Sequence, residues 1–291
     1  MSSRRPPAAT HVQDDLFSVE APVPPPPAMA DDQGAACQKL VLVHQRLCRE
    51  YGCPVGYFHE LTPLDELVSS LLSHRTRNSE SGAAYKELRK RFPDWVAVRD
   101  APVGEVQDAI KTCNWPEQKA PRIQQILRLI TEKRGGDLSL DFLETMPVRE
   151  GRDWLETLPG VGPKTSAAVY IFSRIRGRAL PVDSHHHRVA QRLGLIPMSL
   201  DVGPAHAVLE AMLPEEWDAQ TVYDDHEIIM FHGQRCCHFR GPECDRCVLL
   251  DLCPTGQIRL EQQAHDPSGS GKSTKPPTRD KRTVMPAPST P

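Results

Sequence analysis

The chain has 291 residues, 39% of them hydrophobic, and a formal net charge of −3 at pH 7, so it can bury one large or two modest cores. No apolar run approaches the ~20 residues of a membrane helix, and the opening stretch MSSRRPPAATHVQDDLF lacks the apolar segment of a secretory signal. We therefore expect no membrane association and a reducing intracellular setting, where clustered cysteines bind metal more often than they pair.

Both ends of the chain read as disordered tails. Residues 1–33 are rich in proline and acidic residues and include VPPPP, whereas residues 256–291 are basic and polar. Between them, apolar residues recur at i, i+3, i+4 and i+7, and no stretch alternates like a strand. The sequence predicts an all-α protein with about ten helices, at 37–52, 64–76, 81–92, 103–113, 121–135, 151–157, 165–175, 186–195, 205–213 and 222–236.

The stretch LETLPGVGPKTSAAV, residues 155–169, predicts a tight turn between two helices. Gly160 and Gly162 flank Val161, so the backbone there can adopt positive φ and approach a partner closely. Pro163 suits the first position of the following helix. The free N–H groups of the turn and of the helix start form an anion site that fits a DNA phosphate. An ordinary helix–turn–helix connection explains the turn alone equally well.

Two residues in and after this turn are candidates for catalysis. Lys164 lies in the first turn of the helix, where the dipole disfavours a cation, and a lysine kept neutral is a nucleophile. Asp183 precedes another helix, where it can act as a simple N-cap. Its second interpretation is a carboxylate that takes a proton from Lys164 or stabilises positive charge on a sugar.

Four of the nine cysteines lie within residues 237–253, at the spacing C-x6-C-x2-C-x5-C. Four thiolates suit either zinc or an iron–sulfur cluster. Cys236 is an extra neighbour outside the spacing. We interpret the remaining cysteines, Cys37, Cys48, Cys53 and Cys113, as buried small hydrophobic residues.

LPGVGPKTSAAV, then VDSHHHRVAQRLG, then the four-cysteine spacing resemble, in that order, the endonuclease III family of DNA base-excision glycosylases, from about residue 37 to 254. The resemblance implies a two-lobed helix-hairpin-helix fold with a C-terminal [4Fe–4S] loop. Its lobes would be a helical barrel at 57–176, with the helix-hairpin-helix at 155–173, and a cluster domain at 34–56 plus 177–255. The cluster ligands would be Cys237, Cys244, Cys247 and Cys253.

The same resemblance implies a glycosylase with AP-lyase activity on oxidised pyrimidines, acting through a Lys164 Schiff base assisted by Asp183. Its partner would be duplex DNA with a damaged or abasic nucleotide. We expect a cytoplasmic, nucleoid-associated monomer, with Arg240 of the cluster loop at a phosphate. Two alternatives stay open: a DNA-binding paralogue with weak or no catalysis, and a zinc-stabilised helical DNA-binding protein.

Two positions depart from the family pattern. Arg75 occupies the place of a glutamine that fills the hole left by a flipped base, and Trp115 holds the place of an apolar wedge. Both positions probe damaged DNA in the family, so we expect Arg75 and Trp115 to contact DNA. The departures therefore concern residues that bear on the substrate range and on the level of activity.

Overall fold

The computed structural model describes residues 30–265, with side chains from Gly34 onward. This range contains twelve α-helices, three 3-10 helices and no strand, which confirms the all-α prediction. The helices are α1 (Ala30–Tyr51), α2 (Pro63–Ser73), α3 (Asn78–Arg91), α4 (Trp95–Asp100), α5 (Val103–Ala109), α6 (Pro116–Lys133), α7 (Val148–Glu156), α8 (Pro163–Phe172), α9 (Ser184–Leu193), α10 (Val202–Glu210), α11 (Ala219–Arg235) and α12 (Pro254–His265), with 3-10 turns η1 (Asp141–Thr145), η2 (Cys244–Arg246) and η3 (Leu250–Leu252).

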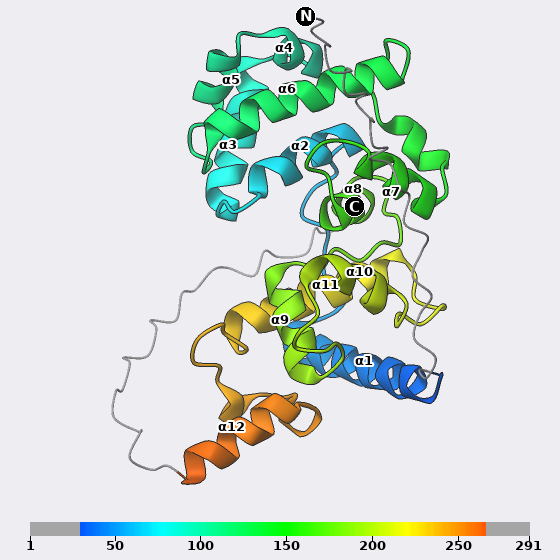
Figure 1. Cartoon of the computed structure of the whole chain (residues 1–291), viewed down its shortest axis with the longest axis vertical. Coiled ribbons are helices and arrows are strands. Elements are labelled where there is room, and N and C mark those ends of the chain that lie inside the picture. The colour runs from blue at the N-terminus through cyan, green and yellow to red at the C-terminus, as the bar shows by residue number, and fades with distance from the viewer. Residues whose placement is uncertain (1–29, 266–291) are drawn as a thin grey trace, which may run out of the picture.

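Buried apolar side chains form two cores. The helices that carry them form two groups in Figure 1, α2 to α8 in one and α1 with α9 to α12 in the other. The first core gathers side chains from α2 to α8, and the second gathers those of α1, α9, α10 and α11. Helix α8 supplies Tyr170 to the first core and Ile171 to the second. Every residue of α8 from Thr165 to Ile171 is buried, as expected of a helix enclosed on all sides. The lobe boundaries at 57, 176 and 255 stay a prediction.

Two helices extend into the segments that were predicted to be disordered tails. Helix α1 begins at Ala30, inside the predicted tail 1–33. Helix α12 runs to His265, so residues 256–265 are helical and not part of a basic tail. This segment packs next to the cysteine loop, and that tertiary contact supports a helix that its short polar sequence did not indicate. Residues 1–29 and 266–291 of the predicted tails lie outside the described residues.

Two cysteines differ from their predicted state. Cys48 and Cys53 are joined by a disulfide, with their Cα atoms 5.1 Å apart. The chain turns at Gly52, with φ 88°, directly after α1 ends at Tyr51. That turn brings the two Cα atoms within the range that a disulfide spans. The expectation that both are buried small hydrophobic residues was therefore wrong. It was also wrong for Cys37, which is free but only half-buried, whereas Cys113 is free and buried.

Within residues 30–265, none of the helices is both long enough and apolar enough to cross a bilayer.

Four helices begin at a residue whose side chain caps the helix. The side chains of Thr62, Asp94, Asp183 and Asp218 each accept a hydrogen bond from a backbone N–H in the first turn of the helix that follows.

Candidate active site

The hairpin, residues 158–162, joins α7 to α8 as predicted. The Val161 side chain is buried in the first core and anchors the hairpin. Gly160 has φ 80°, a conformation that favours glycine. Gly162 is different, because it caps α8 with φ −116° and does not need positive φ. A Cβ at Gly162 would meet no atom within 4 Å, so the helix start is open to a ligand.

Arg122 of α6 lies against the hairpin. A Cβ built on Gly160 would stand 2.7 Å from the Arg122 Nη1 atom. A guanidinium therefore lies beside N–H groups that already favour an anion. Arg122 could not be predicted from the sequence, because it precedes the hairpin by almost forty residues.

Lys164 and Asp183 act on the same buried imidazole, that of His226 in α11. Burial lowers the pKa of His226 to about 4, the Asp183 carboxylate opposes this shift, and the Lys164 charge adds to it. Lys164 is exposed, in the first turn of α8. Lys164 at the start of α8 and Asp183 at the start of α9 therefore both influence the charge of one buried ring.

Asp183 is the N-cap of α9. Its Oδ1 accepts the His186 backbone N–H at 2.7 Å. Burial by itself would raise the pKa of Asp183, but the His226 ring and this N–H outweigh it, and the pKa is lowered. At pH 7 His226 is neutral, so of these two effects only the hydrogen bond from the His186 N–H still favours the charged carboxylate. Asp183 can thus cap the helix and present a charged carboxylate.

His74, at the C-terminal end of α2, also faces Lys164. Its Nε2 lies 3.0 Å from the Thr165 Oγ1 atom, one residue beyond Lys164. Burial and then the charges of Lys164, Lys119 and Arg122 lower the pKa of His74 to about 4. His74 is therefore neutral at pH 7, and it ties the end of α2 to the start of α8.

Arg75 and Trp115 share an unusual backbone conformation. Their φ values are 50° and 55°, in the left-handed region that L-residues seldom adopt. Asn114 links the two positions, because its Nδ2 donates to the Arg75 carbonyl at 2.6 Å. Its backbone N–H donates to the Thr76 hydroxyl at 3.2 Å. Both Arg75 and Trp115 are exposed, so a strained backbone presents them to solvent.

Lys119 of α6 forms hydrogen bonds with the same loop, the one that follows α2. Its ammonium donates to the Leu72 carbonyl at 2.6 Å, the His74 carbonyl at 2.9 Å and the Thr76 hydroxyl at 2.7 Å. Lys119 was not predicted from the sequence. Its signal was present, since it lies near a helix N-terminus, where a cation opposes the dipole as Lys164 does.

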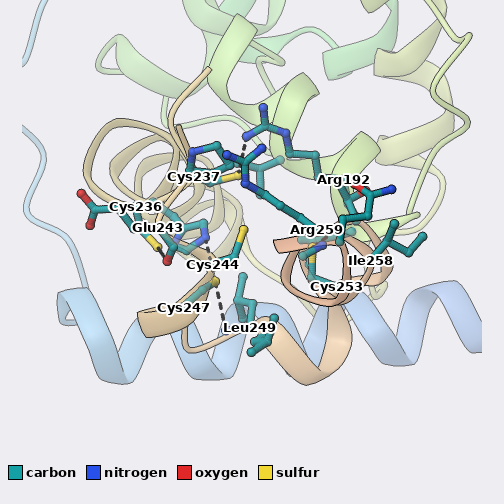
Figure 2. Close-up of a pocket in the computed structure, with 18 residues that line it drawn as sticks. Arg192, Cys236, Cys237, Glu243, Cys244, Cys247, Leu249, Cys253, Ile258 and Arg259 are labelled. Atoms are coloured by element: carbon teal, nitrogen blue, oxygen red, sulfur yellow. Dashed lines mark hydrogen bonds between the residues drawn. The ribbon is translucent and has the colours of Figure 1, made fainter. Parts of the chain in front are cut away.

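The four predicted ligand cysteines line one cavity of about 280 Å³ (Figure 2). Arg192 donates to the Cys237 sulfur at 3.2 Å. Backbone N–H groups point at two other sulfurs, from Leu249 to Cys247 at 3.4 Å and from Gly256 to Cys253 at 3.3 Å. Helix α12 forms one wall, through Thr255, Gly256, Ile258 and Arg259. Thiols facing donors and a cation suit a sulfur-bound metal group.

The spacing of the sulfur atoms separates a single ion from a cluster. Two sulfurs on one zinc ion lie at most about 4.6 Å apart, twice the Zn–S bond length. In residues 30–265 the one compact group of such donors is His232, Cys236 and Cys247, all within 4.8 Å of one another. No three of the four motif cysteines are that close. The motif set fits a larger group, and the compact set fits a single ion.

Arg240 is exposed in the loop between the first two motif cysteines. Within residues 30–265 it makes no hydrogen bond or ion pair to the hairpin, to Lys164 or to Asp183. Its contact with a phosphate stays a prediction.

The sequence of the chain is similar to those of known DNA repair proteins. The family profile "HhH-GPD superfamily base excision DNA repair protein" matches residues 68–211. Endonuclease III of Bacillus subtilis (strain 168) is 34% identical over 201 residues, covering 68% of this chain and 83% of that protein. Endonuclease III of Thermotoga maritima is 33% identical over 195 residues, covering 67% and 84%.

A solved structure supports the fold. The structure of a non-covalent endonuclease III–DNA complex superimposes with a TM-score of 0.65 at 24% identity, over 77% of this chain and 98% of that one. Fold and hairpin thus define the class of helix-hairpin-helix base-excision repair proteins. Within that class, the chain belongs to the endonuclease III family of DNA glycosylases, as the motifs indicated.

Proposed function

We propose that the protein is bifunctional: it excises oxidised pyrimidines from duplex DNA and then cleaves the strand at the abasic site. The observation that supports this best is the position of Lys164, which is exposed in the first turn of α8 directly after a hairpin that is open to a phosphate, while Asp183 caps the start of α9. The damaged nucleotide would be flipped out of the stack to reach them.

The chemistry follows from an amine beside a carboxylate. The neutral Lys164 amine attacks the sugar C1′, and the bond from C1′ to the base breaks with its electron pair on the base. Asp183 takes the proton that the amine loses. The nitrogen lone pair then forms the C1′=Nζ bond of a protonated imine, while the C1′–O4′ bond breaks with its electron pair on O4′, which takes the proton held by Asp183. Loss of a C2′ proton breaks the C3′–O bond, which releases the 3′ phosphate by β-elimination.

The DNA would be held mainly through its backbone. The open N-terminus of α8 and the Arg122 guanidinium supply contacts that carry no sequence information. Arg75 and Trp115 are the residues that we propose to enter the duplex beside the flipped nucleotide. Arg240 would add a phosphate contact from the cysteine loop.

We assign a [4Fe–4S] cluster to Cys237, Cys244, Cys247 and Cys253. The cluster would act as a structural clamp that holds the loop and α12 against α9. The rival is a single zinc ion on His232, Cys236 and Cys247, a set that the structure makes compact. Visible absorption and metal analysis of the purified protein distinguish the two.

A paralogue that binds DNA with little catalysis is the second candidate, because Arg75 and Trp115 depart from the family pattern. The test is a strand-cleavage assay on duplexes that carry one oxidised pyrimidine or one abasic site. We expect cleavage by the wild type, none by Lys164→Gln, and full cleavage by the control Lys133→Gln, an exposed lysine at the end of α6. Tight binding without cleavage by the wild type would favour the paralogue.

We further propose a monomer that acts in the cytoplasm at the nucleoid. Light scattering of the purified protein with and without duplex DNA tests the monomeric state. A stable dimer would refute it.

A further inference from the structure

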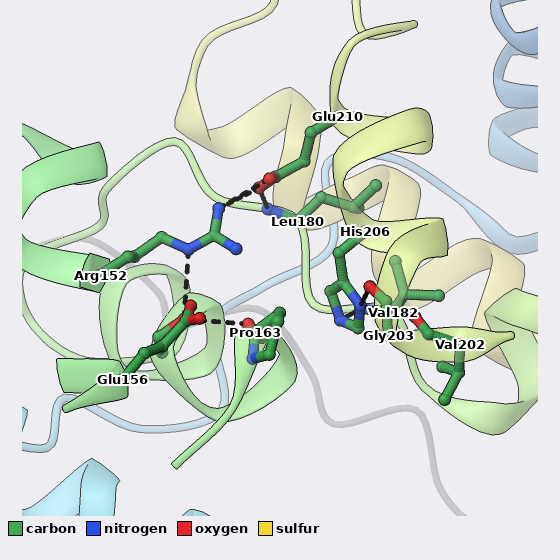
Figure 3. Close-up of polar contacts among 10 residues, drawn as sticks. Arg152, Glu156, Pro163, Leu180, Val182, Val202, Gly203, His206 and Glu210 are labelled. Carbon is green, nitrogen blue, oxygen red and sulfur yellow. Dashed lines mark hydrogen bonds and ion pairs between the residues drawn. The ribbon is translucent and has the colours of Figure 1, made fainter. Parts of the chain in front are cut away.

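A single arginine hydrogen-bonds elements of both cores (Figure 3). Arg152 lies on α7, and its Nη1 contacts the two carboxylate oxygens of Glu210 at 2.5 and 2.7 Å. Its Nε donates to the Ser166 hydroxyl at 3.2 Å. Ser166 is on α8, whereas Glu210 is on α10. The pair is mostly shielded, with side-chain exposures of 14% and 24%, so solvent screens it less than an exposed pair.

The Ser166 end of this link reaches the candidate nucleophile. Ser166 is fully buried and lies two residues after Lys164. Its hydroxyl donates to the Glu156 Oε1 atom at 2.6 Å, so the oxygen is free to accept from Arg152. Arg152 and Glu156 together fix the first turn of α8, from which Lys164 projects.

The Glu210 end reaches the candidate carboxylate. Glu210 Oε1 also accepts the Leu180 backbone N–H at 3.0 Å. Two residues further on, the Val182 N–H donates to the His206 Nε2 atom at 3.0 Å. Leu180 and Val182 are completely buried, so their N–H groups need protein partners. Both partners come from α10, and the segment that they hold ends at Asp183.

The protonation of His206 is fixed by its two contacts. Its Nδ1 lies 2.8 Å from the Val202 carbonyl and donates to it, which leaves Nε2 as the acceptor for Val182. The ring is therefore a neutral acceptor in the folded protein.

We propose that Arg152, Glu210 and His206 are positioning residues that set the Lys164 amine and the Asp183 carboxylate at a fixed separation. One path of hydrogen bonds runs from the start of α8 through Ser166, Arg152 and Glu210 to the segment that carries Asp183. This inference rests on the proposed function, because it assigns the path a role in that chemistry.

A purely structural ion pair predicts a different result. Removing one partner of a shielded pair destabilises a protein, and replacing both partners by apolar residues often restores stability. If Arg152 only stabilises the fold, activity returns with stability. If it positions the two groups, stability returns and activity does not.

The matched control is Arg99 of α4. Its guanidinium also joins one hydroxyl to one carboxylate, at 3.0 Å from Thr131 and 2.7 Å from Asp100, with side-chain exposures of 19% for Arg99 and 57% for Asp100. Both partners of Arg99 lie in elements of the first core, away from Lys164 and Asp183. Arg99→Met therefore removes the same kind of contact without touching the path.

The experiment measures the rate of borohydride trapping on abasic duplex in single turnover, the Kd for that duplex, and the Tm. For Arg152→Met we expect a rate lower by about 10–100-fold, since small misplacements of reacting groups have effects of that size. The Kd should change less than about threefold, because the hairpin contacts remain. The double variant Arg152→Met/Glu210→Gln removes the unpaired charge and keeps an amide oxygen that accepts the Leu180 N–H, so it should regain Tm but not rate. Arg99→Met should lose no rate.

Amide hydrogen exchange of residues 179–187 gives a readout that does not depend on catalysis. Arg152→Met should speed exchange in this segment although Arg152 lies on another helix, and Arg99→Met should not. Unchanged exchange and trapping in Arg152→Met, or a trapping rate restored in the double variant, would overturn the proposal. A wild type that never traps would instead refute the proposed function, while the exchange result still decides whether Arg152 holds the segment. If Arg152→Met is insoluble, Glu210→Leu removes the same link from the other side.

Discussion

Two lysines near helix N-termini have different surroundings in this protein. Lys119 donates three hydrogen bonds to the loop that follows α2, and burial lowers its pKa. Lys164 is exposed, and its charge reaches His74 and His226. The position in the helix is similar in both, so the sequence could single out Lys164 only through the adjacent hairpin. The role of Lys119 depends on contacts with residues more than forty positions away.

The carboxylate of Asp183 can be tested without disturbing the cap. Asp183→Asn retains an oxygen that accepts the His186 N–H but loses the charge. We expect single-turnover base release to fall by about 10²–10⁴-fold, the usual range for acid–base assistance. The Tm should hardly change. The control is Asp218→Asn, which alters the equivalent cap of α11, with its 2.8 Å bond from the Thr221 N–H, and should keep full activity.

A second carboxyl makes stability depend on pH. Burial raises the pKa of Glu66 to about 8, against the opposing effects of the Ser70 hydroxyl and Arg176. Its Oε2 lies 3.3 Å from the His59 Nε2 atom but makes no hydrogen bond, so nothing offsets the cost of burying a charged carboxylate there. The folded state then binds more protons than the unfolded state between about pH 4.5 and 8, and stability falls as pH rises through that window.

Glu66→Gln keeps the size of the side chain and removes the titration. We expect its Tm to exceed that of the wild type by about 5 °C at pH 8.5, and the difference to vanish near pH 4.5. Thermal unfolding at several pH values measures this. An advantage that is equal at all pH values would show that Glu66 does not titrate as described.

The loop after α2 and the loop before α6 behave as one element. Asn114 and Lys119 join them across sequence separations of 39 and 47 residues. The sequence indicated Arg75 and Trp115 separately, through a family pattern. It could not reveal their left-handed backbone or their connection, because neither leaves a local signal in residues that are not glycine.

The strain at Arg75 predicts a trade between stability and binding. The left-handed conformation costs an L-residue about 1–2 kcal/mol, which glycine avoids while adding chain entropy to the unfolded state. Arg75→Gly should therefore keep the unfolding free energy or raise it by up to about 1 kcal/mol. Its affinity for abasic duplex should fall about tenfold or more. Arg77→Gly, at an ordinary φ of −65°, is the control and should show no gain in stability.

Contiguous features of the molecule were the ones that sequence could predict. The hairpin, the cap at Asp183 and the four-cysteine spacing each lie within one short stretch, and each appears in the structure where expected. The Cys48–Cys53 disulfide, helix α12 and the Arg152 link were not predicted. Each depends on how distant or turning segments meet, and α12 in particular gains its support from the cysteine loop it covers.

The cysteine loop provides a test at the scale of the second core. If the four motif cysteines hold an iron–sulfur cluster, Cys253→Ser should lose iron and visible colour and become poorly soluble. Cys236→Ser, one residue outside the motif, should keep both. The zinc alternative predicts that Cys236→Ser loses zinc and that Cys253→Ser keeps it, because Cys236 belongs to the compact set and Cys253 does not. Iron and zinc analysis with absorption spectra decides between them.

The central claim is that Lys164 forms a covalent imine with the damaged sugar. The most direct measurement is borohydride reduction of the wild-type protein on abasic duplex, followed by proteolysis and mass spectrometry of the DNA-linked peptide. We predict a single adduct on Lys164 and none in Lys164→Gln. An adduct on another amine, an undiminished adduct in Lys164→Gln, or DNA that is bound but never linked would contradict the claim.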